Sequence, residues 1–334
     1  MTGHPVGGIA CVGNWIVDIV HSIDLWPQKS DLVHIRDETA GVGGGAANVA
    51  MDLAAFDAQL PVLAVGLLGR DLHAATVRAA CMAAGVDAGW LADTADAPTA
   101  HTHVMNVPGD SRTFFYHPGT NDLLGEAEIP VEALAEAGVK IVYLGYLNLL
   151  GRLDHIDPDG STAAARVLRR AQAAGMLTCV DLVSADSPKF RQTVAAALPH
   201  IDMLFLNEVE AQRATGVAVD GPSDRAGFAS AAAVLLAGGA GTVVVHSPAL
   251  SLWHKGGEAP FWATPAPVDP QRIVSPVGAG DAFCAGAIYA MHQGWPVARA
   301  LRLAHAAAAA ALGGSTATDA VPSLAILTQG WDDI

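Results

Sequence analysis

The sequence VSPVGAGDAFCAGA, from Val274 to Ala287, places three small residues where a loop enters an apolar helix. Gly278, Ala279 and Gly280 let backbone N–H groups approach a ligand closely, and a helix N-terminus adds about half a positive charge. Together these features predict an anion-binding site. Asp281 follows in the first turn. Its carboxylate could accept a proton from a hydroxyl that attacks a bound phosphoryl group, or it could stabilise the helix dipole, and the residues alone leave both interpretations open.

Around this stretch, short apolar segments alternate with alanine-rich helical segments along the chain. The expected strands are 8–12, 61–66, 141–144, 177–182, 203–206 and 242–246. The expected helices are 46–56, 71–84, 161–174, 208–215, 225–237, 280–292 and 297–312. Apolar strands separated by helices predict an α/β fold with a central, mostly parallel sheet flanked by helices in three layers. Ligands of such sheets bind beyond the carboxyl ends of the strands.

Two segments, about 14–38 and 98–118, break this alternation because they contain no helical pattern and alternate polar with apolar residues. We expect them to form a small β-sheet that leaves the main body and covers one edge as a lid. The chain 1–334 is then a single domain with a small β subdomain. The alternative is that these two segments form a β-hairpin excursion from the main body that has no function. Because an exposed β edge can pair with a second copy, a homodimer through the lid is a candidate assembly.

The composition restricts the classes of partner. The 334 residues are 51% hydrophobic and carry a net charge of −15, which argues against global disorder and against binding to nucleic acid or to an anionic membrane. The uncharged run 226–254 is long enough for a membrane span, but glycines at 238–241 and Pro248 interrupt it. The four cysteines lack zinc-ligand spacing, and no secretory signal is recognisable. We expect a cytoplasmic protein that binds small molecules.

Two further segments place polar groups beside glycine or apolar residues. GVGGGAANVA (Gly41–Ala50) is either a flexible turn or backbone pressed against ligand hydroxyls, with Asn48 hydrogen-bonding to them. It differs from the dinucleotide fingerprint in its spacing, no strand is expected directly before it, and it has no Walker A lysine. GNWIVD (Gly13–Asp18) carries Asn14 and Asp18 in an apolar run. A buried carboxylate must be paired or meet a ligand, so the role of Asp18 is either structural or ligand-binding.

These three segments, in their order along the chain, resemble those of the ribokinase-like (PfkB) family of carbohydrate and nucleoside kinases, and the resemblance covers essentially the whole chain. The G-A-G-D pattern ending at Asp281 is the most specific part, and the family's G-G-x-x-x-N element matches Gly43, Gly44 and Asn48. The resemblance implies a kinase that uses ATP and Mg²⁺ to phosphorylate a primary hydroxyl of a sugar or sugar-like substrate. A nucleoside kinase and a catalytically silent ligand-binding relative remain as alternatives.

The resemblance also implies roles for individual residues. It makes Asp281 the catalytic base and the backbone of Gly278, Ala279 and Gly280 the anion hole. The residues implied to hold the acceptor are Asn14, Asp18, Gly43, Gly44, Asn48 and Arg112. Those implied on the nucleotide side are Asn207 and Glu210 of an N-x-x-E element, together with His246 and Pro248, with Glu210 helping to hold magnesium.

The sequence departs from the family pattern at three places. Ser275-Pro276 replaces an Asp-Thr pair whose Asp helps form a monovalent-cation site, so potassium activation is doubtful. The usual G-x-x-G nucleotide loop is replaced by residues 246–249, which read HSPA. Gly45 stands where many relatives have Lys, so classical ribose specificity is not supported. Four aromatic residues expected on the lid keep the nucleoside alternative open, because they could stack on a base: Trp15, Phe114, Phe115 and Tyr116.

Overall fold

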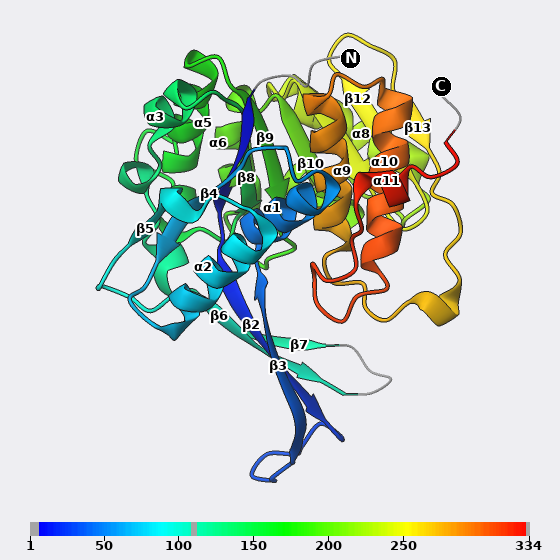
Figure 1. Ribbon diagram of the computed structural model, residues 1–334. Helices are drawn as coiled ribbons and strands as arrows, with labels where there is room; N and C mark the ends of the chain where they lie inside the picture. The colour runs from blue at the N-terminus through cyan, green and yellow to red at the C-terminus, as the bar shows by residue number, and fades with distance from the viewer. Residues whose placement is uncertain (1–6, 108–111, 332–334) are drawn as a thin grey trace.

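The computed structural model describes residues 7–107 and 112–331. Its main body is built on a nine-stranded sheet in the order β13-β12-β11-β10-β9-β8-β1-β4-β5. The strands are β1 (Gly8–Gly13), β4 (Val62–Leu68), β5 (Leu91–Asp93), β8 (Val139–Leu147), β9 (Leu177–Leu182), β10 (Met203–Asn207), β11 (Thr242–His246), β12 (Ser251–Lys255) and β13 (Phe261–Ala263). The seven strands from β11 to β5 run parallel, and β12 and β13 form an antiparallel edge (Figure 1).

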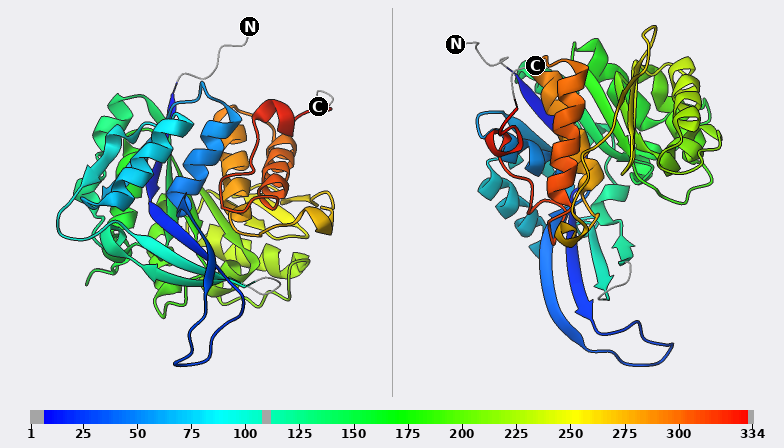
Figure 2. Two further views of the ribbon diagram at one scale, coloured as in Figure 1. Left: turned by 60° about the horizontal axis from the view of Figure 1, so that its bottom comes forward. Right: turned by 90° about the vertical axis from the view of Figure 1, so that its right-hand side faces the viewer.

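Helices cover both faces of this sheet, as the alternation of segments predicts (Figure 2). One face packs on α1 (Gly45–Phe56), α2 (Leu72–Ala84), α9 (Ala279–His292) and α10 (Val297–Ala311), with the short α11 (Leu324–Leu327) at its margin. The other face packs on α3 (Val131–Glu136), α4 (Gly151–Asp154), α5 (Ala163–Ala173), α6 (Phe190–Ala197), α7 (Glu208–Thr215) and α8 (Arg225–Ala237). Neighbouring residues of a strand point to opposite faces, so Ile9 joins one core and Ala10 the other. The predicted three-layer α/β fold is confirmed.

The uncharged run 226–254 forms most of α8, a glycine-containing turn, β11 and part of β12. None of the helices in residues 7–107 and 112–331 has the length and apolar character that a membrane crossing requires. All four cysteines are buried thiols and none is in a disulfide.

A second, four-stranded sheet projects from the body as the lid (Figure 1). Its strands are β2 (Ile16–Ile23), β3 (Ile35–Gly43), β6 (His101–Asn106) and β7 (Thr113–His117), in the order β3-β2-β6-β7. The expectation that no strand directly precedes the glycine-rich helix start is wrong, because β3 continues to Gly43. A glycine is required there, since a Cβ at Gly43 would lie 2.1 Å from the Asp18 carboxylate.

One aromatic residue expected on the lid lies in the body instead. The Trp15 side chain is completely buried, and its indole N–H donates a hydrogen bond of 3.0 Å to the backbone oxygen of Val65. The chain bends out of β1 only after this residue, so β2 and the lid begin at Ile16. Trp15 therefore anchors the base of the lid in the core.

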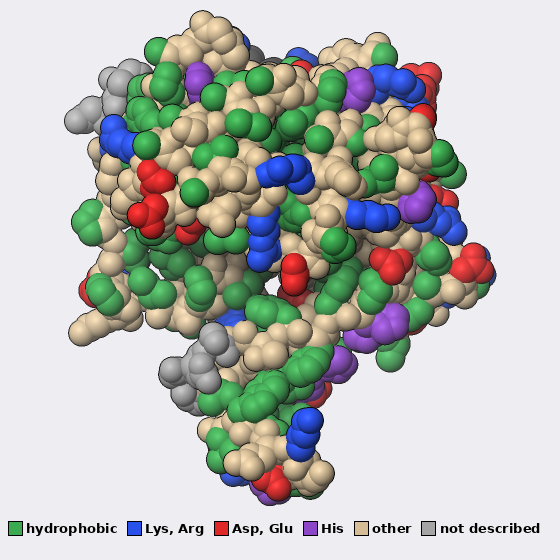
Figure 3. Space-filling view, turned by 180° about the vertical axis from the view of Figure 1, so that it is seen from behind, with side chains coloured by type: hydrophobic (Ala, Val, Ile, Leu, Met, Phe, Trp, Pro, Cys, Tyr) green, Lys and Arg blue, Asp and Glu red, His purple; other side chains and the backbone are tan. Residues whose placement is uncertain are grey.

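One face of the lid carries a cluster of histidines. The His101 ring stacks on His117 of β7 at 4.9 Å and on His73 of α2 at 5.0 Å. Beside them, His21 and His103 join through ring nitrogens 2.9 Å apart. Figure 3 shows histidines gathered where the lid meets the body. This stack connects the lid to α2.

Asp52 of α1 is a carboxylate in the core whose two side-chain oxygens are buried without a hydrogen-bond partner. Burial raises the pKa of Asp52 well above its usual value, and the charge of Asp281 raises it further. The folded protein therefore holds Asp52 neutral at a pH where the unfolded chain has released the proton. The free energy of unfolding falls as the pH rises through that interval.

We predict that Asp52→Asn stabilises the protein by at least about 1 kcal/mol at pH 8, because a neutral isostere lacks this cost. The gain should shrink toward zero near pH 4. Thermal unfolding across this pH range measures it, with Asp31→Asn, at an exposed position of the β2–β3 loop, as the control. A gain that is equal at every pH would show that folding does not raise the pKa of Asp52.

Candidate active site

A cavity of about 630 Å³ lies between the lid and the carboxyl ends of the parallel strands. The space-filling view shows the molecule hollowed between body and lid (Figure 3). The lid contributes Ile16, Asp18, Thr102, Phe114 and Tyr116 to its wall, and the body contributes Gly44, Asn48, Tyr146, Leu149, Asp181, Leu182, Val183, Ser184, Asn207, Glu210, His246, Val277, Gly278, Gly280 and Asp281. Four of these described lining residues are acidic, and none is a lysine or an arginine.

Asp281 lies in the first turn of α9, where one carboxylate oxygen is held by two donors. The Asn48 amide nitrogen of α1 donates to Oδ2 at 2.8 Å. The Tyr146 hydroxyl of β8 donates to the same oxygen at 2.9 Å. The other oxygen, Oδ1, is buried without a hydrogen-bond partner. The carboxylate is thus fixed by one oxygen and has the other available to accept a proton.

The pKa of Asp281 is raised from its usual value to about 6. Burial is the largest cause, and the negative charges of Glu210 and Asp18 add to it. The hydrogen bonds from Asn48 and Tyr146 act in the opposite direction, because they stabilise the charged form. A carboxyl group with this pKa is still ionised at neutral pH, and it is more basic than an exposed aspartate.

Tyr146 is a site residue that no sequence pattern identified. Its backbone is left-handed, with φ of 57°, which is uncommon for a residue with a side chain. A Cβ at Gly45 would lie 2.6 Å from the Tyr146 ring, so the space beside α1 is open to Tyr146 only because residue 45 is glycine. Burial and the neighbouring Asp281 raise the pKa of Tyr146 well above its usual value, so it remains a proton donor in the hydrogen bond.

The small residues at the start of α9 form a helix N-terminus that faces the cavity. Gly278 is left-handed, with φ of 85°, and a Cβ there would lie 2.3 Å from the backbone oxygen of Ala317. The Ala279 N–H donates to the Pro276 carbonyl at 3.3 Å, so this amide already has an acceptor. The N–H groups of Gly280 and Asp281 follow in the first turn, where a helix supplies no acceptor of its own. These two amides, together with the N–H of Gly278, which lines the cavity, are the candidate anion-binding donors.

The predicted acceptor-binding residues gather at the base of the lid. Asp18 lines the cavity, and burial raises its pKa, while a hydrogen bond from Thr102 and the charge of Arg112 oppose this shift. Arg112 lines a smaller recess beside Asp18 and donates to the Ser315 carbonyl at 3.1 Å. The Oδ1 atom of Asn48 lacks a hydrogen-bond partner, which leaves an acceptor within a residue that lines the cavity.

Asn14, Gly43 and Gly44 support this wall, and only Gly44 is part of the lining. Gly44 has φ of 93°, and a Cβ there would lie 2.6 Å from the backbone oxygen of Asn14. The Asn14 amide nitrogen donates to the Leu149 carbonyl at 3.1 Å, so this fully buried side chain ties the β1–β2 connection to the segment that follows β8. The close approach of backbone segments thus explains these glycines.

The N-x-x-E element forms the start of α7 as a capping box. The Asn207 side chain accepts from the N–H groups of Val209 and Glu210, and the Asn207 N–H donates to the Glu210 carboxylate at 2.9 Å. The Ser184 hydroxyl donates to the other Glu210 oxygen at 2.9 Å. Both Asn207 and Glu210 line the cavity, so the cap also fixes a carboxylate toward it.

Asp181 and Ser184 are further lining residues that the sequence interpretation missed. Asp181 comes near the end of an apolar strand and is almost fully buried. Burial raises its pKa well above the usual value, and so do the charges of Glu210 and Asp281. Of the residues expected in the altered nucleotide loop, His246 lines the cavity, whereas Pro248 is exposed and does not contribute to it.

Known proteins resemble this chain over most of its length. Curated relatives include the ATP-dependent ribose-1-phosphate kinase of Halopiger xanaduensis, 26% identical over 90% of this chain and 89% of that protein. The ribokinase of Arabidopsis thaliana is 27% identical over 90% of this chain and 74% of that protein.

Solved structures share the fold of this chain. The Arabidopsis thaliana ribokinase complexed with ribose and ATP has a TM-score of 0.80 at 23% identity, over 97% of this chain and 98% of that one. A putative ribokinase II from E. coli in complex with ATP and Mg²⁺ has a TM-score of 0.76 at 18% identity, over 96% and 98%. The sequence model of the pfkB family carbohydrate kinase matches residues 8–324. The chain therefore belongs to the pfkB family of carbohydrate kinases, phosphotransferases that have an alcohol group as acceptor.

Proposed function

We propose that this protein transfers the γ-phosphoryl group of ATP to a primary hydroxyl of a sugar or sugar-like substrate, with Asp281 as the general base. The observation that supports this most strongly is the geometry of Asp281. Its Oδ2 atom is fixed by Asn48 and Tyr146, and its Oδ1 atom has no partner in the cavity wall. A substrate hydroxyl that donates to Oδ1 would be oriented and made more nucleophilic at the same time.

The start of α9 supports the transfer step. The amides of Gly280 and Asp281 would donate to the oxygens of the phosphoryl group as charge redistributes over them. The base and these donors belong to the same helical turn, so the attacking hydroxyl and the phosphorus would meet at one place. The lid sheet over the cavity would limit the access of water and so protect ATP from hydrolysis.

Kinases of this family use ATP with Mg²⁺. The cavity fits a hard divalent cation, because Glu210 and Asp181 present carboxylate oxygens and no described basic side chain balances them. Burial raises the pKa of both groups, which is the expected consequence of unpaired negative charge in a closed site. Bound Mg²⁺ supplies positive charge that offsets the charge of the phosphates. We propose that Glu210 and Asp181 hold it.

The nucleoside-kinase alternative depends on aromatic residues that could stack on a base. Trp15 is in the core, and Phe115 is exposed and stacks on Trp26 at 6.2 Å, so neither lines the cavity. Phe114 and Tyr116 do line it and keep this alternative open. An ATP-consumption screen over sugars, polyols and nucleosides distinguishes the two: we expect sugars or polyols to be consumed faster than any nucleoside.

We predict that Asp281→Asn lowers kcat about a hundredfold or more, because the isostere cannot accept the proton. Binding of ATP should change little, and the melting temperature should not fall, because the neutral isostere also removes the cost of a buried charge. ATP consumption and calorimetry measure these effects, with Asp31→Asn as a matched change of an exposed carboxylate. Near-normal turnover in Asp281→Asn would refute the assignment of the base, and no turnover in the unaltered protein would support the catalytically silent alternative.

Asp18→Ala should weaken binding of the acceptor at least about tenfold, while the affinity for ATP changes less than about twofold, because the Asp18 side chain lies at the lid end of the cavity. Asn48→Ala should weaken acceptor binding too, and it should also lower kcat, since it removes a hydrogen bond to Asp281. Calorimetry with each ligand separately tests this division. Equal losses for both ligands would contradict it.

Potassium should increase the rate less than about twofold over sodium at fixed ionic strength. The Ser275 hydroxyl is buried and accepts from the Val277 N–H at 3.2 Å, so it is already engaged in its own loop. Pro276 contributes no N–H and has a restricted φ. Assays in potassium, sodium and a bulky organic cation test this, and a several-fold rise specific to potassium would show that backbone carbonyls suffice for a cation site.

A further inference from the structure

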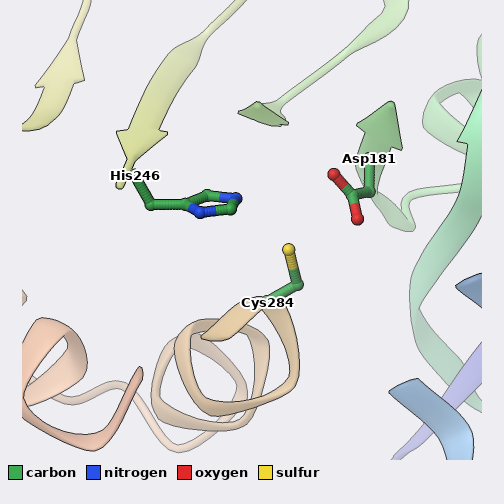
Figure 4. Close-up of side chains that lie close together, drawn as sticks. All are labelled: Asp181, His246 and Cys284. Carbon is green, nitrogen blue, oxygen red and sulfur yellow. The ribbon is translucent and has the colours of Figure 1, made fainter. Parts of the chain in front are cut away.

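Three side chains with different donor atoms meet on the nucleotide side of the cavity, as Figure 4 shows. Asp181 comes from the end of β9, His246 from the end of β11, and Cys284 from the second turn of α9. A carboxylate oxygen, a ring nitrogen and the Sγ atom lie within 4.8 Å of one another. Within residues 7–107 and 112–331, no other group of three such side chains is gathered this closely, including the stacked histidines of the lid.

This donor set differs from the one that Mg²⁺ prefers. Thiolate sulfur and imidazole nitrogen favour zinc and related transition metals, whereas Mg²⁺ takes oxygen ligands. Bonds of about 2.0 to 2.3 Å hold the ligand atoms of a tetrahedral zinc ion about 3.5 Å apart. The three donors therefore need to move together by little more than about 1 Å, which side-chain rotation supplies.

The His246 ring and the Cys284 thiol differ in whether a proton must leave before they can coordinate a metal. Burial, with the neighbouring His305, lowers the pKa of His246 to about 4, so the ring is neutral and can coordinate at neutral pH. The thiol of Cys284 is fully buried and hydrogen-bonds with Asp181. Burial raises its pKa, so a metal must displace the thiol proton to form a metal–thiolate bond, and that proton passes to solvent.

We propose that Asp181, His246 and Cys284 form a binding site for a transition-metal ion of the zinc class, and that its occupation inhibits the enzyme. Three protein ligands leave one position of a tetrahedral ion free. Asp181 and His246 line the cavity whereas Cys284 lies behind it, so this position opens toward the cavity.

The inhibitory half of the proposal follows from what surrounds the site. The Gly280 backbone is packed against His246, since a Cβ on Gly280 would lie 3.5 Å from the imidazole ring. An ion held there would occupy the space beside the phosphate-binding amides, and it would draw Asp181 away from Mg²⁺. This half depends on the proposed kinase function, whereas the metal site itself does not.

Cobalt(II) is the probe for the site, because its absorption reports both thiolate ligation and tetrahedral geometry. We expect titration of the full-length protein, without nucleotide or thiol reductant, to give thiolate-to-cobalt and tetrahedral d–d bands that saturate at one ion per chain. Zinc should abolish them. Cys284→Ala should lose the thiolate band and bind at least about tenfold more weakly. Cys81→Ala, which removes a buried thiol from α2, should behave like the unaltered protein.

A second variant tests the site independently, in case Cys284→Ala does not fold. His246→Gln retains the thiol, and we expect it to weaken cobalt binding similarly, with melting temperatures confirming that both variants are folded. An unaltered protein without the thiolate band, or a folded Cys284→Ala variant that keeps it, would overturn the metal site.

Zinc inhibition of ATP consumption tests the second half. We expect the concentration for half inhibition to rise at least about tenfold in Cys284→Ala and to stay unchanged in Cys81→Ala. Equal inhibition of all three proteins would overturn the inhibitory role. If the cobalt bands depend on Cys284 but no acceptor supports ATP consumption, the kinase proposal and the inhibitory role that depends on it fail, and the metal site stands.

Discussion

The geometry of the candidate active site depends on keeping one ionisable carboxylate, Asp281, buried in the first turn of a helix. Burial of a charge is costly unless hydrogen bonds compensate it, and here α1 and β8 each provide a donor to the same oxygen. The three segments that meet at Asp281 come from residues 45–56, 139–147 and 279–292, far apart in the chain. The cavity lies where these segments meet, between the lid, the ends of the strands and the N-terminus of α9.

These three segments can approach each other this closely only because glycines stand at their contacts. A Cβ at Gly145 would lie 2.4 Å from the Ala46 nitrogen, and one at Gly45 would enter the Tyr146 ring. Gly44 and Gly278 have positive φ angles and lie beside backbone oxygens. The glycines thus bring α1, β8 and α9 within hydrogen-bonding distance of each other, and four acidic side chains line the cavity beside them.

Local patterns predicted much of this architecture. Runs of buried apolar residues identified the main parallel strands, and the G-A-G-D and N-x-x-E elements are helix starts whose geometry depends on neighbours in sequence. Tyr146 and Asp181 escaped prediction because sheet order, not a motif, places β8 and β9 beside the cavity. The sequence favours a place on the lid for Trp15, because it does not show where the chain bends out of β1. The sequence does not show that β3 extends to Gly43, because glycine is depleted in strands.

The most direct test of the account is the pH dependence of kcat/KM in the unaltered protein and in Tyr146→Phe. With the pKa of Asp281 raised to about 6, activity should fall as the pH drops through that value, because the protonated carboxyl cannot act as a base. The Tyr146 hydrogen bond lowers this pKa, so its removal should move the acid limb upward by roughly half a unit to one unit. An acid limb that is absent, or that stays in place in Tyr146→Phe, would contradict the role assigned to Asp281.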